Sequence, residues 1–160
     1  MRFRLPNYHA APLCVLLGLL IALAACNRED SAYVTPSATF RTYKKALVAG
    51  DLDLLWSCLS TSYRNTVYKG DRAALTRAWQ EHPEQFQTVL HQEITQEKPI
   101  NNRIGYLLFD PTTLSSPQAS PFFYFIREAE GWKITTHLDS LFHQELEQAI
   151  AKGEFKLPTD

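Results

Sequence analysis

The sequence predicts an α+β domain in which N-terminal helices pack on an antiparallel sheet of about four strands, with one more helix after the sheet. Two observations lead to this fold class. Apolar residues recur at helical spacing over residues 36–82 and again over residues 139–153, whereas residues 88–137 are rich in β-branched and aromatic residues. Helices followed by hairpin-connected strands are typical of α+β domains. A chain of 160 residues, 45% of them hydrophobic, is long enough for one such domain with a sizeable core.

Three helices are expected before residue 83, because apolar residues recur there every three or four positions. Each is bounded by residues that suit a helix end: an N-cap Thr or Asp, a Pro at a first position that needs no hydrogen bond, or a Gly after the last turn. The residues that mark these ends are Thr35, Pro36, Gly50, Asp51, Gly70, Asp71 and Pro83. A polar connection over residues 60–69 has room for one further helical turn.

Four strands are expected over residues 88–97, 103–109, 122–127 and 132–137. Residues 128–131 form a short hairpin turn between the last two, and Gly131 can take the positive φ that such turns need.

The second and third strands have apolar side chains on both faces, whereas a sheet with one wetted face alternates apolar with polar residues. The second face is therefore expected to be covered by the C-terminal helix, by a second subunit or by a partner. Asp139 is the expected N-cap of that helix, and Gly153 its end.

The first 26 residues have the composition of an export signal. Arg2 and Arg4 are the only charged residues in positions 1–25, and the segment from Ala10 to Ala25 is apolar throughout. This apolar run is shorter than the roughly 20 residues that a membrane-spanning helix needs. A signal peptide over residues 1–25 is therefore expected instead of a permanent span.

The end of this segment, Leu23-Ala24-Ala25-Cys26, resembles the lipobox of bacterial lipoproteins. The resemblance implies that Cys26 becomes the mature N-terminus and carries acyl chains that hold the protein in a lipid bilayer. Two or more chains make a firm anchor, since each buried methylene contributes about 0.8 kcal/mol. The alternative is an ordinary secretory signal with a Cys at the cleavage point by chance.

Lipidation at Cys26 would divide the chain into a lipidated tether over residues 26–34, a domain over residues 35–153 and a tail over residues 154–160. It places the protein in the cell envelope. An Asp after the lipidated Cys resembles an inner-membrane retention signal. Asn27 at this position therefore favours the periplasmic leaflet of the outer membrane if the host has two membranes.

The charge of the chain argues against nucleic acid as a partner. With 16 basic and 17 acidic residues there is no excess of cations to displace counterions from a phosphate backbone. Cys58 has no partner for an internal disulfide once Cys14 is removed and Cys26 is acylated. Its neighbours are apolar, so we expect it to be a small buried hydrophobe and not a reactive thiol.

Three stretches resemble the nuclear transport factor 2-like (cystatin-like) superfamily, an α+β cone in which long helices wrap a strongly curved sheet. Residues 36–51 are similar to its opening helix, Trp56 with residues 59–64 to its second helix, and residues 131–134 to its closing strand. The resemblance implies a small envelope member of this superfamily. The helix after Asp139 departs from the commonest pattern and can occupy the face used in the usual sheet-to-sheet dimer.

Four aromatic residues are the candidates for lining a pocket inside such a cone, with plain core packing as the alternative for each; they are Tyr63, Trp79, Tyr106 and Phe123. Enzymes of the superfamily place an Asp and a Tyr or His in the cone as base and electrophile. The corresponding candidates here are His91, Asp110, Tyr106 and Tyr63. Asp110, however, precedes Pro111 at a strand end, where Asp commonly forms a turn.

These observations predict a lipid-anchored envelope protein with a non-enzymatic role. It would bind a ligand or assemble with an envelope protein or a second copy. We expect no catalytic residue, cofactor or metal, because no Cys/His cluster has zinc spacing and no Gly-rich phosphate loop is present. The alternatives are a small lyase or isomerase acting on an apolar substrate, and a structural lipoprotein without a pocket.

Overall fold

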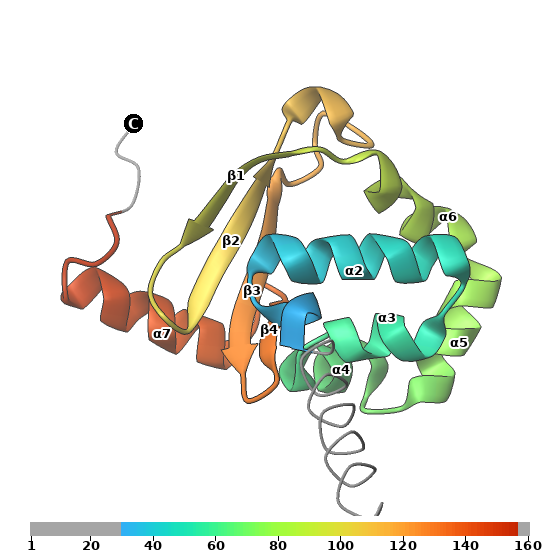
Figure 1. Ribbon diagram of the computed structural model, residues 1–160, viewed down its shortest axis with the longest axis horizontal. Coiled ribbons are helices and arrows are strands. Elements are labelled where there is room, and N and C mark those ends of the chain that lie inside the picture. The colour runs from blue at the N-terminus through green and yellow to red at the C-terminus, as the bar shows by residue number, and fades with distance from the viewer. Residues whose placement is uncertain (1–29, 157–160) are drawn as a thin grey trace, which may run out of the picture.

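The computed structural model describes residues 30–156 and has the expected α+β architecture. The predicted signal peptide, Cys26 with Asn27, and the last four residues of the tail lie outside the described residues. No helix within residues 30–156 combines the length and the apolar character that crossing a bilayer requires. In chain order, with η for 3-10 helices, the elements are η1 (Asp30–Tyr33), α2 (Pro36–Ala49), α3 (Leu52–Cys58), α4 (Thr61–Tyr68), α5 (Arg72–Glu81), α6 (Pro83–Gln87), η2 (Thr88–His91), β1 (Ile94–Pro99), β2 (Ile104–Phe109), η3 (Pro111–Thr113), β3 (Phe122–Glu128), β4 (Gly131–Thr135) and α7 (Ser140–Ala151) (Figure 1).

α2, α3, α5 and α7 begin where the sequence predicts, because the residues before them satisfy free backbone groups. Side-chain oxygens of Thr35, Asp51, Asp71 and Asp139 each accept a hydrogen bond from a backbone N–H in the first turn that follows, at 2.8 to 3.1 Å. Gly50 ends α2 with φ 65°, in the left-handed region where glycine is unstrained. These capping residues act locally, so the helix starts could be predicted from the sequence without knowledge of the fold.

The four strands form one antiparallel sheet in chain order, β1-β2-β3-β4, as predicted. β2 and β3 pair so that Tyr106 lies opposite Tyr124 and Leu107 opposite Phe123. Successive side chains point to opposite faces, so both faces of these two central strands are apolar.

Neither edge strand offers a long regular edge. β1 has a register shift between Ile94 and Gln96 and ends at Pro99. At the other edge Leu59 bridges Ile134 of β4, and Ser60 N donates to Ile134 O at 2.8 Å.

Helices cover the two faces of the sheet unequally (Figure 1). α2 lies along one face, with α3 to α6 beyond it, and α7 lies against the other face. We call the buried residues on the α2 side the main core; they are Phe40, Tyr43, Ala46, Leu47, Leu55, Cys58, Leu59, Leu75, Phe86, Leu107, Phe109, Phe125, Trp132 and Ile134. We call the buried residues on the α7 side the α7 core; they are Ile100, Ile104, Ile126, Phe142 and Ala149.

The C-terminal helix covers only part of the second sheet face. Ile104 and Ile126 are buried in the α7 core, whereas Phe122 is 40% exposed and Tyr106 and Tyr124 are half-buried. The sequence left three ways of covering this face open: the C-terminal helix, a second subunit or a partner. α7, the first of these, covers only part of it.

Cys58 is fully buried in the main core, as expected, and is a free thiol among the described residues. Burial is the main cause that raises the pKa of its thiol to about 12. A neutral thiol at ordinary pH behaves as a small hydrophobe.

The structure differs from the sequence prediction in three local details. α4 fills residues 61–68 where one turn was expected, α6 begins at Pro83 where the third helix was expected to stop, and the first strand begins at Ile94 instead of residue 88. Val89 and Leu90 pack against the main core from η2. Tertiary packing therefore outweighs their preference for a strand.

The predicted tether is shorter than expected because η1 packs on the domain. An aperiodic tether was expected through Val34, yet Tyr33 packs against the main core and its hydroxyl lies 2.6 Å from Ser57 Oγ. Ser57 Oγ already donates to Leu54 O at 2.7 Å, so the Tyr33 hydroxyl is the donor between the two. The folded part of the chain thus starts before Thr35.

Candidate functional site

Two of the four predicted ligand-binding residues lie on opposite faces of the sheet. Phe123 in β3 packs against the main core, with its ring centroid 5.3 Å from that of Phe40. Tyr106 in β2 lies on the α7 side, where its ring centroid is 5.5 Å from that of Phe122. The fold therefore does not bring Tyr106 and Phe123 together.

The other two predicted residues lie on different helices of the main layer. Tyr63 in α4 packs beside Tyr68, and Trp79 in α5 packs against Phe86 with ring centroids 5.1 Å apart. Trp79 borders a shallow apolar hollow of about 340 Å³ at the far end of α2. The remaining residues of that hollow are Leu47, Val48, Phe86, Gln87, Leu90 and His91.

The residues considered for a lyase or isomerase are also dispersed. Asp110 caps η3, where its Oδ1 accepts hydrogen bonds from Thr112 N at 2.8 Å and Thr112 Oγ1 at 2.7 Å. These bonds lower the pKa of the Asp110 carboxyl, as expected for a turn-forming Asp. His91 is exposed on η2, and Tyr63 and Tyr106 belong to α4 and to the opposite sheet face.

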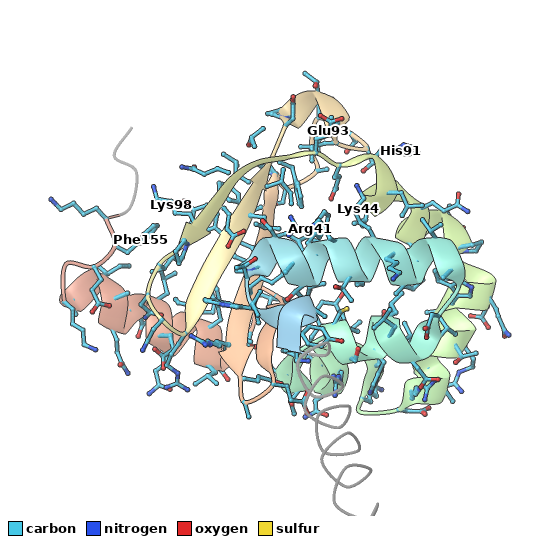
Figure 2. All side chains as sticks on the ribbon, viewed as in Figure 1. Arg41, Lys44, His91, Glu93, Lys98 and Phe155 are labelled. Atoms are coloured by element: carbon cyan, nitrogen blue, oxygen red, sulfur yellow. The ribbon has the colours of Figure 1, made fainter. Side chains whose placement is uncertain are left out.

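Side chains occupy the space between α2 and the sheet, where a cone pocket was expected. The rings of Phe40, Phe109, Phe123 and Phe125 form successive pairs with centroids 4.9 to 6.0 Å apart. At the open side of α2, Lys44 extends toward the segment that carries His91 and Glu93, and its Nζ donates to Gln92 O at 3.1 Å (Figure 2). This side of the sheet is therefore packed core.

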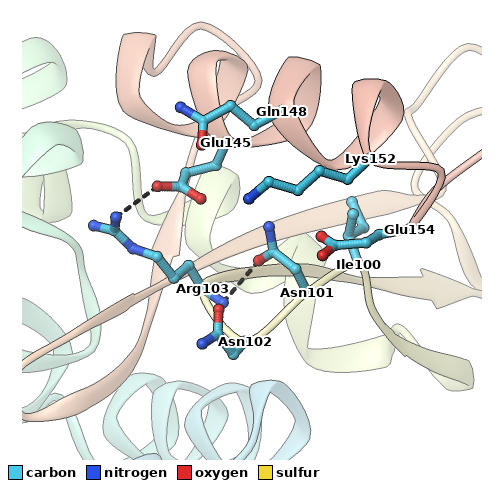
Figure 3. A pocket seen from close by; sticks show the side chains of 8 residues that line it. All are labelled: Ile100, Asn101, Asn102, Arg103, Glu145, Gln148, Lys152 and Glu154. Carbon is cyan, nitrogen blue, oxygen red and sulfur yellow. Dashed lines mark hydrogen bonds and ion pairs between the residues drawn. The ribbon is translucent and has the colours of Figure 1, made fainter.

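A larger hollow, of about 610 Å³, lies on the other side of the sheet, between α7 and the turn that joins β1 to β2. We call it the α7 hollow. It is lined mainly by polar and charged side chains (Figure 3); the lining residues are Ile100, Asn101, Asn102, Arg103, Glu145, Gln148, Lys152 and Glu154. Its volume falls within the range of small-molecule sites.

The β1–β2 turn presents its side chains from a backbone held by Asn101. Asn101 Oδ1 accepts hydrogen bonds from Arg103 N at 2.8 Å and from Ile104 N at 2.9 Å. Such a local side-chain acceptor replaces a backbone partner and stiffens the turn. Ile100, at the start of the turn, is buried in the α7 core, which fixes the turn against the helix.

α7 supplies the opposite wall from one face of the helix. Glu145, Gln148 and Lys152 are spaced by three and four residues, so their side chains lie one above the other. Glu154 follows the helix end, where its backbone N–H donates to Ala149 O at 2.9 Å. Phe142 and Ala149 pack on the sheet and hold this face against the turn.

Opposite charges alternate around the α7 hollow. Arg103 Nη1 lies 2.6 Å from Glu145 Oε1; the Glu145 side chain is only 9% exposed and that of Arg103 is 51% exposed. Figure 3 shows Lys152 pointing into the hollow between Glu145 and Asn101, and within the described part of the chain it has no ion-pair partner within 4.0 Å. The walls thus offer both cations and carboxylates to one occupant.

This arrangement is suited to binding. Arg103, Lys152 and the side-chain amides donate hydrogen bonds, while Glu145 and Glu154 accept them. The lining residues carry charged and amide side chains, with no hydroxyl, thiol or imidazole among them. A molecule with both a negative and a positive group finds a complementary partner for each.

None of the residues that line the α7 hollow is among the predicted site residues. The spacing of Glu145, Gln148 and Lys152 indicates a polar stripe on the C-terminal helix, but such stripes usually face solvent. The consecutive Asn101, Asn102 and Arg103 indicate a turn. Only the packing of α7 across the sheet brings these two segments together.

Comparison of the chain with protein-family models, with curated proteins and with solved structures gave no match.

Proposed function

We propose that this protein is a lipid-anchored protein of the cell envelope that binds a small zwitterionic molecule in the α7 hollow, without transforming it. The observation that carries the binding role is the alternation of Arg103 and Lys152 with Glu145 and Glu154 around one hollow. A charge pattern of this kind selects ligands by complementarity.

The size and rigidity of the hollow narrow the class of ligand. About 610 Å³ is ample for a short peptide with free termini, whose ammonium and carboxylate are separated by several bonds. The Arg103–Glu145 ion pair and the Asn101 turn hold two walls of the hollow in place, and such preorganised groups lower the cost of ordering on binding.

The membrane location rests on Leu23-Ala24-Ala25-Cys26, which resembles a lipobox, and on the basic and apolar segment before it. For the domain we propose membership of the nuclear transport factor 2-like superfamily. The order of helices before an antiparallel sheet supports it, and Trp132 in the closing strand packs in the main core with the first helices.

Titration calorimetry with three peptides tests the binding role. Trialanine carries both charges, its N-acetyl form lacks the ammonium, and its C-terminal amide lacks the carboxylate. We expect trialanine to bind and each blocked peptide to bind at least about tenfold more weakly, a difference of about 1.4 kcal/mol. Equal affinities for the three, or no binding of trialanine, would contradict the proposal.

Substitutions then assign the binding to the hollow. Lys152→Gln and Glu154→Gln each remove one charge from the wall and are expected to weaken trialanine binding to about the level of the blocked peptides. Glu147→Gln is the matched control, because Glu147 is exposed on another face of α7 and should leave the affinity unchanged.

Metabolic labelling tests the anchor independently. Radioactive palmitate should enter the wild-type chain in the native host, and Cys26→Ala should abolish the label and move the protein to the soluble fraction. A soluble, unlabelled wild-type chain would refute the envelope location while leaving the binding experiment standing.

A further inference from the structure

We infer that the segment after the anchor docks on the domain through Tyr33, and that the end of the sheet carrying the β3–β4 hairpin therefore stands against the bilayer surface. The inference rests on the proposed acylation of Cys26. It assigns an interaction surface, the hairpin end, and a partner, the lipid headgroups.

Tyr33 makes two polar contacts that fix η1 to the domain. Its hydroxyl donates to Ser57 Oγ at 2.6 Å. Its ring covers Lys133, whose Nζ lies 3.7 Å from the ring centroid. Lys133 is fully buried, and the negative face of an aromatic ring attracts a desolvated ammonium more strongly than a solvated one.

The buried ammonium of Lys133 depends on the Tyr33 ring for one of its contacts. Its Nζ donates to Ser57 O at 2.8 Å and lies 3.2 Å from Glu130 Oε2, and the Tyr33 ring closes its remaining side. Without that ring, water would replace an aromatic face beside a charged group. Docking of η1 is therefore coupled to the packing of β4.

The backbone around Tyr33 is fitted closely as well. Thr42 Oγ1 in α2 shares its proton between Ala38 O at 2.9 Å and Ala32 O at 3.3 Å. Gly131, with φ 114°, leaves room for Tyr33, since a Cβ built there would lie 2.5 Å from Tyr33 O. A side chain at position 131 would therefore displace η1 as well as strain the turn.

The short distance in sequence between the anchor and η1 sets the geometry. Only residues 27–29 separate Cys26 from Asp30, so the Cα atoms of Cys26 and Asp30 are at most about 14 Å apart. An undocked tether through Val34 would have allowed about twice this distance. The domain is thus held close to the lipid headgroups by its η1 side.

The sheet direction then decides which end faces the lipid. η1 lies beside β4 and the β3–β4 hairpin (Figure 1). β3 has seven residues, so η3 and the loop before β3 lie about 20 Å from the hairpin along the strand. The hairpin carboxylates are satisfied: Glu128 accepts from Thr61 N at 2.8 Å and Glu130 pairs with Lys133. They therefore repel anionic headgroups less than free carboxylates would.

The orientation also locates the α7 hollow. Arg103 lies in the wall of the hollow, and its backbone oxygen accepts a hydrogen bond from Arg127 N at 2.7 Å. The β1–β2 turn therefore lies at the same end of the sheet as the β3–β4 hairpin. A ligand in the hollow would therefore be held at the level of the headgroups.

Fluorescence quenching on vesicles tests this orientation. The full-length acylated protein is reconstituted in vesicles of phosphatidylethanolamine and phosphatidylglycerol that contain a headgroup spin label. A fluorophore is attached at Ala129→Cys in the hairpin or at Gln118→Cys before β3; buried Cys58 stays unlabelled. We expect headgroup quenching at position 129 to exceed that at position 118 at least fivefold.

Variants at Tyr33 test the docking itself. Tyr33→Ser removes the ring and should bring the two quenching values within twofold of each other, while Tyr33→Phe keeps the ring over Lys133 and should retain most of the difference. A thermal melt of each variant shows that the domain is folded.

The outcomes separate the two proposals. Equal quenching at both positions in wild-type protein that floats with the vesicles would overturn the orientation and leave the anchor intact. Wild-type protein that does not float overturns the anchor, and the orientation with it. A Tyr33→Ser variant that keeps the full difference would overturn the role of Tyr33.

Discussion

The main core and the α7 core lie on opposite faces of one sheet but are built differently. The main core draws on four helices and three strands and contains or contacts Trp56, Trp79 and Trp132, the three tryptophans of the chain. The α7 core has five buried residues, and its edge holds the nearly buried Glu145 carboxylate. One face therefore supplies most of the apolar burial, and the other presents charged groups.

This difference indicates that stability and ligand binding depend on different faces of the sheet. Burial of large apolar side chains is the main source of stability, and it is concentrated under α2. Charged groups cost stability when they are desolvated; buried Asp139 and Glu145 belong to α7 and its N-cap, while buried Lys133 lies beside η1. A site on the weaker layer can be altered without unfolding the stronger one.

The largest effect is expected from Phe40→Ala in the main core. Phe40 is 1% exposed and packs against Phe109 and Phe123, so its truncation leaves a cavity and should lower the free energy of unfolding by about 3–5 kcal/mol. Urea unfolding followed by tryptophan fluorescence measures it. A loss under about 1 kcal/mol would show that the main core does not dominate stability.

A smaller and local effect is expected from Phe142→Ala in the α7 core. Phe142 is 2% exposed and is the only aromatic residue that α7 buries. Its truncation should lower the free energy of local unfolding of α7 by about 2–3 kcal/mol. Amide hydrogen exchange should speed up in α7 and stay unchanged in α2. Equal acceleration in both helices would mean that the two cores unfold as one unit.

The smallest effect is expected from Cys58→Ala, and it depends on pH. Removing the buried sulfur should cost about 1 kcal/mol at neutral pH. The folded-state pKa of the thiol, about 12, lies above its ordinary value of 9.0, so the stability that the neutral thiol contributes is complete below pH 9 and is lost as pH rises toward 12.

The stability difference between wild type and Cys58→Ala should therefore narrow above pH 9 and change sign before pH 12, because each unit by which the pKa is raised corresponds to about 1.4 kcal/mol. Urea midpoints of the two proteins across that range measure it. A difference that stays constant would mean that Cys58 ionises alike in the folded and unfolded chains.

The fold was predictable where the physical cause is local. Helix starts follow from side chains that cap the next few backbone N–H groups, as at Asp51 and Asp139. The hairpin before β4 follows from Gly131, whose φ of 114° few other residues adopt. The β1 start was misplaced because Val89 and Leu90 pack against residues far away in sequence.

The candidate site was not predictable because its cause is tertiary. Arg103 and Glu145 are 42 positions apart, and nothing in either segment indicates that they meet. The four predicted aromatic residues share only their residue type, and residue type does not say which face of a sheet a side chain occupies. Tyr106 and Phe123 show the result, since pairing of β2 with β3 separates them.

Both margins of the sheet are closed to further strand pairing. β1 is interrupted by its bulge, carries the exposed charges Glu97 and Lys98, and ends at Pro99, all of which hinder the addition of a foreign strand. β4 is screened by the Leu59 bridge. The sheet therefore gives other copies of this chain no exposed strand edge on which to aggregate.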